Sequence, residues 1–81
     1  MFNAYIELHA NDQIIAQDDA RANSAYGARI AAFDKIREMV KALPDNTQVY
    51  VYVDVETPAG TYVCHDDIFG RVRGGELEVE Y

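Results

Sequence analysis

The chain has 81 residues, 49% of them hydrophobic, and its 14 acidic and 7 basic residues give a formal net charge of −7 at pH 7. This composition predicts one folded domain over residues 1–81 and excludes a disordered segment. Binding to a phosphate backbone relies on lysine and arginine, so the acidity argues against direct nucleic-acid binding and favours a protein partner with a basic surface. The alternative is that the acidity only keeps the protein soluble.

The features that indicate cellular location favour the cytoplasm. No apolar run approaches the roughly 20 residues that a membrane-spanning helix needs, so we expect no membrane association. The opening MFNAYIELHA lacks a basic stretch followed by an apolar one, so we expect no signal peptide. Cys64 is the only cysteine and cannot form an intrachain disulfide, which is typical of the reducing cytoplasm of a bacterial or phage-infected cell.

Two strands are predicted before any helix. Phe2–His9 alternates apolar and polar residues, the pattern of a half-buried strand. Asn11-Asp12 is turn chemistry, and Gln13–Ala22 is expected to return as an edge strand. Asp18-Asp19 interrupts this segment, and an early helix start at that point is the competing interpretation.

A single helix is predicted from Ser24, which can cap its first turn, to about Leu43, ahead of Pro44. Its apolar residues recur at intervals of three and four and predict one buried stripe: Tyr26, Ile30, Phe33, Ile36, Val40 and Leu43. Several alanines favour the helix and allow it to lie close to a sheet.

The segment Thr47–Glu56 predicts the central strand. Its valines fall on one face and its tyrosines and acids on the other: Val49, Val51, Val53 and Val55 against Tyr50, Tyr52, Asp54 and Glu56. We expect the valine face to meet the core and the aromatic-acidic face to be at least partly exposed.

Two hairpins are predicted after this strand. Thr57–Gly60 forms the first loop, with a return through Thr61–His65, and Asp67–Gly70 is consistent with either strand or a helical turn. A Gly74-Gly75 loop predicts a second hairpin that pairs Arg73 with Glu76, Val72 with Leu77 and Arg71 with Glu78. In this register the residues expected to point to the core are Leu77, Val79 and Tyr81, and those expected to point outward are Glu76, Glu78 and Glu80.

Together these elements predict an α+β fold. The order is β-β-α-β-β followed by a C-terminal hairpin, and the short loops favour an antiparallel sheet of four to six strands. The one helix packs on one face of the sheet, so the opposite face is expected to stay exposed unless a partner covers it.

The exposed face is the predicted binding surface, because the helix holds four of the seven bases and leaves twelve acids against three bases elsewhere. Tyrosines are common at interaction hot spots, although cross-strand tyrosine pairs could instead only stabilise the sheet. The predicted partner-binding residues are Tyr5, Glu7, Tyr50, Tyr52, Asp54, Glu56, Asp66, Asp67, Glu76, Glu78 and Glu80. The last three form an acidic stripe with roughly the spacing of phosphates, but Arg71 and Arg73 would neutralise two of them.

Catalytic and metal-binding motifs are absent from the sequence. Cys64-His65-Asp66-Asp67 contains metal-ligand residue types, but neighbouring residues of a strand point to opposite faces and cannot readily share one ion. No glycine-rich phosphate loop, G-x-S-x-G or H-E-x-x-H occurs. We therefore expect no metal, no cofactor and no enzymatic activity, and a small enzyme or metal binder is the less favoured alternative.

The overall profile resembles several small phage anti-CRISPR proteins. The chain is acidic and poor in cysteine, and Ala20-Arg21-Ala22-Asn23-Ser24 leads from a strand into an alanine-rich helix. The resemblance implies a β-β-α-β-β-like fold and a non-catalytic inhibitor that blocks a basic, nucleic-acid-binding channel of a CRISPR effector. Anti-restriction proteins are a related interpretation. The alternative is an accessory or assembly module that forms a homodimer through its tyrosine-bearing sheet face.

Overall fold

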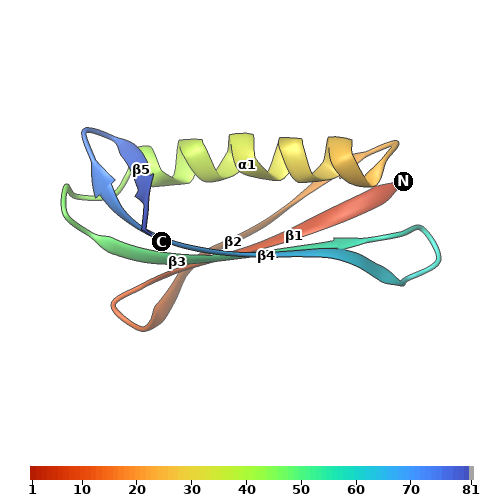
Figure 1. Cartoon of the computed structure of the whole chain (residues 1–81), viewed down its shortest axis with the longest axis horizontal. Helices are drawn as coiled ribbons and strands as arrows, with labels where there is room; N and C mark the ends of the chain where they lie inside the picture. The colour runs from red at the N-terminus through yellow and green to blue at the C-terminus, as the bar shows by residue number, and fades with distance from the viewer. Residues whose placement is uncertain (81) are drawn as a thin grey trace.

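A computed structural model describes residues 1–80 and shows an antiparallel sheet with a single helix on one face (Figure 1). The elements are β1 (Phe2–Ala10), β2 (Gln13–Ala22), α1 (Ala25–Lys41), β3 (Gln48–Glu56), β4 (Tyr62–Arg73) and β5 (Glu76–Val79). The strand order is β2-β1-β3-β4-β5, with every neighbouring pair antiparallel. The predicted α+β class is therefore confirmed.

Both segments that the sequence left open are strands. Asp18 and Asp19 lie within β2, opposite Ile6 and Tyr5 of β1, and no helix starts there. β4 continues without interruption from Tyr62 to Arg73, so the stretch 67–70 also belongs to the sheet. This length gives β4 many more residues than its outer neighbour β5 can pair.

The core lies between α1 and the sheet, and β3 forms its centre. Val49, Val51, Val53 and Val55 are at most 4% exposed, whereas the intervening residues of β3 are only half-buried. β1 contributes the matching alternation, with its even-numbered residues from Ala4 to Ala10 buried. The alternation in the sequence thus predicted the buried face of both central strands.

The buried stripe of α1 differs from the predicted one. The fully buried positions follow a four-residue interval, and they are Ala28, Ala32, Ile36 and Val40. Tyr26 is 71% exposed and Ile30 is 41% exposed, so the prediction for these two residues was wrong. Small side chains allow a helix to approach a sheet closely, and here α1 turns its alanines toward β1 and β2, which it contacts more extensively than β3, β4 and β5.

The N-terminal end of α1 is formed as predicted. Ser24 has extended backbone geometry and its Oγ accepts the Gly27 N–H at 3.0 Å, which satisfies one of the free donors of the first turn. Within residues 1–80, no helix combines the length and the apolar character needed to cross a membrane.

Two ion pairs join the sides of α1 to the sheet. Arg29 donates two hydrogen bonds to the Asp66 carboxylate of β4, at 2.7 and 2.9 Å. On the other side of the helix, Lys35 lies 3.3 Å from the Asp18 carboxylate of β2. Both acids point from the sheet toward the helix, so helix bases neutralise the charge on this face.

The C-terminal hairpin has the predicted register. β5 pairs with β4 through Arg71–Glu78, Val72–Leu77 and Arg73–Glu76, around a loop in which Gly74 and Gly75 have φ of 60° and 79°. A Cβ on Gly70 would lie 2.6 Å from the Glu78 carbonyl oxygen, so this close approach of β5 requires glycine. Leu77 packs against the core as expected, but Val79 is 42% exposed, and Tyr81 lies outside the described residues.

Replacing Val51 with alanine tests the position of the core. Val51 is fully buried in the central strand, so the substitution should lower the free energy of unfolding by about 2–3 kcal/mol through lost burial and a residual cavity. Ile14→Ala is the control, because Ile14 is 53% exposed and its loss should cost less than about 1 kcal/mol. Denaturant unfolding measures both, and equal effects would contradict the assigned core.

Replacing Asp66 with asparagine tests the ion pair with Arg29. Hydrogen bonds from Arg29 lower the pKa of Asp66, so the pair stabilises the fold above the ordinary carboxyl pKa and is lost as the pH falls through the lowered value. We expect Asp66→Asn to cost roughly 1–2 kcal/mol at neutral pH and to flatten the acid side of the stability profile. A wild-type stability that does not fall in acid relative to the variant would contradict this.

Candidate protein-binding surface

The sheet face opposite α1, here called the open face, has no element of residues 1–80 packed over it (Figure 1). Strand register places alternate residues of each strand on this face. Its central residues are Tyr5, Glu7 and His9 of β1, Asp19 of β2, Tyr50, Tyr52, Asp54 and Glu56 of β3, and His65, Asp67 and Phe69 of β4. The face therefore combines aromatic rings with carboxylates from four strands.

The aromatic rings form one continuous cluster. The ring centroids of His9 and Tyr52 are 5.3 Å apart, those of Tyr52 and Tyr50 are 4.4 Å apart, and those of Tyr50 and Phe69 are 4.0 Å apart. His65 adds a further contact to Tyr52 at 6.2 Å. Such edge-on and tilted contacts hold the rings in place, so the cluster offers a stiff surface to a partner.

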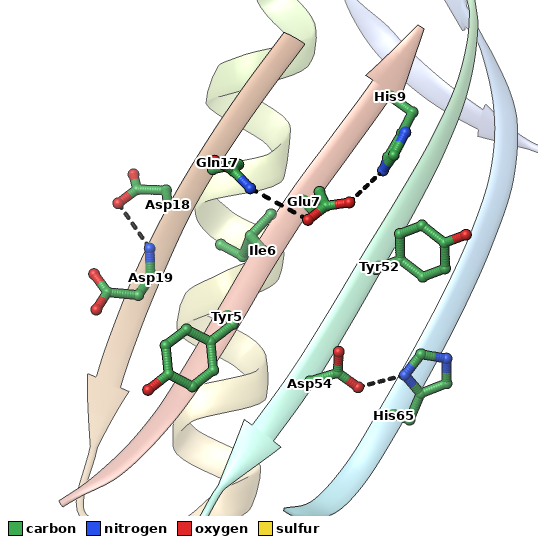
Figure 2. A pocket seen from close by; sticks show the side chains of 10 residues that line it. All are labelled: Tyr5, Ile6, Glu7, His9, Gln17, Asp18, Asp19, Tyr52, Asp54 and His65. Carbon is green, nitrogen blue, oxygen red and sulfur yellow. Dashed lines mark hydrogen bonds and ion pairs between the residues drawn. The ribbon is translucent and has the colours of Figure 1, made fainter. Parts of the chain in front are cut away.

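A hollow of about 820 Å³ opens on this face beside the aromatic cluster (Figure 2). It crosses four strands, and its lining includes Tyr5, Glu7, His9, Asp54 and His65. Figure 2 shows these side chains on the sheet with α1 behind it, so the hollow faces away from the helix. Its lining mixes ring surfaces with carboxylates that a cationic side chain could approach.

Each histidine of the open face is bonded to carboxylates. His9 Nε2 lies 2.6 Å from Glu7 Oε1. His65 bridges two acids, with Nδ1 bonded to Asp54 and Nε2 at 2.9 Å from Asp67 Oδ1. The two ring nitrogens of His65 can both donate only when the imidazole is protonated, so this arrangement favours the charged form.

The pKa shifts on the open face follow from these contacts. The hydrogen bond to Asp54, and then that to Asp67, raise the pKa of His65. Hydrogen bonding to Tyr52, with partial burial and the nearby Asp67, raises the pKa of Tyr50, so this phenol stays neutral at physiological pH. The charge of the open face therefore depends on the protonation of His65.

The structure separates the predicted site residues into three groups. Seven lie together on the open face: Tyr5, Glu7, Tyr50, Tyr52, Asp54, Glu56 and Asp67. Asp66 lies on the helix side, bonded to Arg29, because it has the opposite parity to Asp67 along β4. Glu76, Glu78 and Glu80 lie on or next to β5 at the corner of the sheet, where Arg73 pairs with Glu78 at 3.3 Å and Arg71 with Glu80 at 3.4 Å.

Sequence reasoning missed four members of the open face: His9, Asp19, His65 and Phe69. The alternation of Phe2–His9 already placed His9 beside Tyr5 and Glu7. For the residues of β4, the missing information was the register with β3, which pairs Asp54 with His65 and Tyr50 with Phe69. The Asp67–Gly70 stretch carries no clear strand pattern, so this pairing was not readable from the sequence.

No set of three or more histidine, cysteine or acidic side chains in residues 1–80 is placed to hold a metal ion. The histidines lie in the same aromatic cluster, but each bonds its own carboxylates rather than sharing a centre.

Titration of His65 tests the bridge between Asp54 and Asp67. We expect NMR to give His65 a pKa above its ordinary value of about 6.5, and Asp54→Asn to lower that pKa. The bridge stabilises the fold fully below the ordinary pKa and is lost as the pH rises through the raised value. Glu7→Gln is the control, because Glu7 bonds His9 and not His65; a wild-type His65 pKa at or below the ordinary value would contradict the bridge.

Comparison with known proteins found no relative of this chain. No protein-family model matches the chain, and no curated protein or solved structure matches it. The functional argument therefore starts from the residues of the open face, their charge and their exposure.

Proposed function

We propose that this chain is a small acidic inhibitor that acts by binding and not by catalysis. Its open face docks onto a basic surface of a larger protein complex and occupies a place that nucleic acid would otherwise take. No cofactor is needed for this action. The channel of a CRISPR effector, or the DNA-binding surface of a restriction enzyme, is the kind of target that the resemblance of the sequence profile implies.

The observation that carries the proposal is the uneven neutralisation of charge on the two sides of the sheet. On the helix side, Asp66 and Asp18 are paired with Arg29 and Lys35. On the open face, four of the five carboxylates listed above pair only with histidines or with Arg21, which lies 4.0 Å from Asp19. Glu56 has no ion-pair partner among residues 1–80, and Arg71, which shares the parity of this face, pairs with Glu80. Carboxylates that are balanced only by histidines or by a distant arginine attract a basic partner and speed its association.

The aromatic cluster supports the same proposal. Tyr5 is 44% exposed, and Tyr50 and Tyr52 are half-buried, so their rings remain partly accessible. Arginine side chains stack on such rings while their guanidinium groups reach nearby carboxylates. The open face thus provides both contacts that an arginine-rich surface would use.

The shape of the hollow favours binding over catalysis. His65 is half-exposed, and both of its ring nitrogens are already bonded to carboxylates. General acid-base catalysis works best where water is excluded and a ring nitrogen is free to reach the substrate. His65 meets neither condition, and a broad acidic surface suits a protein partner better.

Self-association through the open face is the second candidate. Phe69 is 55% exposed and extends the aromatic cluster beyond Tyr50, as a sheet-to-sheet dimer would require. Two copies would, however, bring their acidic open faces together, and like charges across an interface cost free energy. The inhibitor therefore remains the first proposal.

Charge reversal on the open face tests the proposal. Affinity capture from bacterial lysate at low and high salt, with mass spectrometry, identifies the target, and the affinity is then measured with the purified complex. The double variant Asp54→Lys with Glu56→Lys should bind roughly 100-fold more weakly or not at all, because two attractive contacts become repulsive. Wild-type binding should also weaken as salt rises.

The matched control reverses two acids on the far side of the molecule. Asp34→Lys with Glu38→Lys changes the net charge by the same amount on α1, beside the helix-side groove and away from the open face. This variant should bind nearly as well as the wild type. Equal loss in both variants would mean that only net charge matters, and full binding by the Asp54 and Glu56 variant would contradict the assigned surface.

A further inference from the structure

The two edges of the sheet are not equivalent, and the edge at β2 is capped at Asp19 by the chain's own side chains. Asp18 Oδ1 accepts the backbone N–H of Asp19 at 2.8 Å. Lys35 Nζ donates to the backbone carbonyl of Asp19 at 2.7 Å. Both backbone groups at the middle of this edge therefore have partners, and the charges of Asp18 and Lys35 discourage a further strand.

At the other edge, alternate residues of β4 direct their backbone groups outward. Val72 donates its N–H to the Thr47 carbonyl and accepts the Asn46 N–H, at 2.9 and 2.8 Å, so its backbone faces the β3 side. Successive residues of a strand bond to opposite sides. The odd-numbered residues of β4 must then face away from β3, and the Phe69 carbonyl agrees, since it accepts the Glu80 N–H at 2.8 Å.

Most of this outer edge of β4 has no strand beside it. β5 pairs only with residues 70–73, and the Glu80 contact extends this by one carbonyl. The outward backbone groups of His65 and Asp67 have no strand partner among residues 1–80. The molecule thus has one edge that is capped at its middle by Asp18 and Lys35, and one edge with free donors and acceptors at His65 and Asp67.

A groove lies directly beside this free edge. It has a volume of about 1030 Å³ and runs between α1 and the β4–β5 corner. Its apolar lining includes Phe33, Ile68, Leu77 and Val79, and charged residues of α1 and β5 also line it. It exists because α1 packs mainly over β1 and β2 and leaves the β4 side of the sheet less covered. A strand added to β4 would direct every second side chain toward this groove.

We propose that the free edge of β4 is a strand-addition site for an extended segment of a partner protein in which basic and apolar residues alternate. Its backbone would bond to His65 and Asp67. Its apolar side chains would lie toward the groove, and its basic side chains would lie on the open-face side next to the Asp67 carboxylate.

Charge decides between this occupant and a second copy of the chain. Antiparallel pairing of two β4 edges would bring the Asp67 carboxylates of two copies together, in molecules that each carry a net charge of −7. A basic strand instead meets complementary charge. The inference shares only the Asp67 carboxylate with the proposed function. Its backbone bonds and the helix-side groove are separate from the other open-face residues, so either proposal can fail alone.

A model peptide tests the proposal on the full chain. The probe is a short acetylated and amidated peptide that alternates lysine with valine, and its matched control carries N-methyl groups on the backbone nitrogens of its bonding edge. We expect the probe to bind, to slow hydrogen exchange of the His65 and Asp67 amides, and to lose affinity about tenfold or more on N-methylation.

A pair of protein variants isolates the backbone of β4. Asp67→Pro removes the outward N–H without removing a bond to β3, whereas Asp67→Asn keeps the N–H and removes the same charge. The proline variant should bind the probe about tenfold more weakly than the asparagine variant. The N-methylated peptide gives an independent answer on the wild-type chain if the proline variant does not fold.

Three results would overturn the proposal. In the first, the N-methylated peptide binds as well as the probe, and NMR chemical shifts change only at open-face residues such as Tyr52. This result would assign binding to the open face alone. Another is that the His65 and Asp67 amides become protected as protein concentration rises without peptide, which would make a second copy the occupant. The third is the absence of any binding at millimolar peptide.

Discussion

The structure depends on the fact that one helix cannot cover five strands. A helix with its side chains is about 10–12 Å wide, and strands lie about 4.8 Å apart, so α1 can shield roughly two or three of them on one face. Its alanines Ala28 and Ala32 bring it down over β1 and β2. The opposite face and the β4 side of the sheet therefore stay exposed. Both proposed binding sites lie on surface that the helix leaves uncovered.

The distribution of charge follows the same division. The helix carries four of the seven bases, and Arg29 and Lys35 neutralise the two acids that point toward it. The open face has no lysine among residues 1–80. Its positive charge comes from its histidines, the edge residue Arg21, and Arg71 and Arg73 at the end of β4, which pair with Glu80 and Glu78. An acidic chain thus becomes a molecule with one balanced side and one strongly acidic side, which gives a basic partner a preferred orientation before contact.

The sequence predicted the two central strands and the register of the last hairpin. Alternation in β3 identified the buried valines, and the glycine loop with its flanking charges set the β4–β5 register. The rotation of α1 was not readable, because the rule that large apolar residues face the core competed with the close packing that alanines allow, and packing prevailed at Tyr26 and Ile30. Likewise, Asp66 and Asp67 point to opposite faces because they alternate along β4. The sequence around them has no clear strand pattern, so this could not be predicted.

The central claim is that the open face is kept for a basic partner and is not closed by a second copy of the chain. Sedimentation equilibrium from micromolar to millimolar concentration, at low and high salt, tests this most directly. The account predicts a monomer throughout, because the acidic open faces of two facing copies repel. A stable dimer that persists at high salt and dissociates when Tyr52 is replaced by aspartate would contradict it and identify the face as a self-association surface.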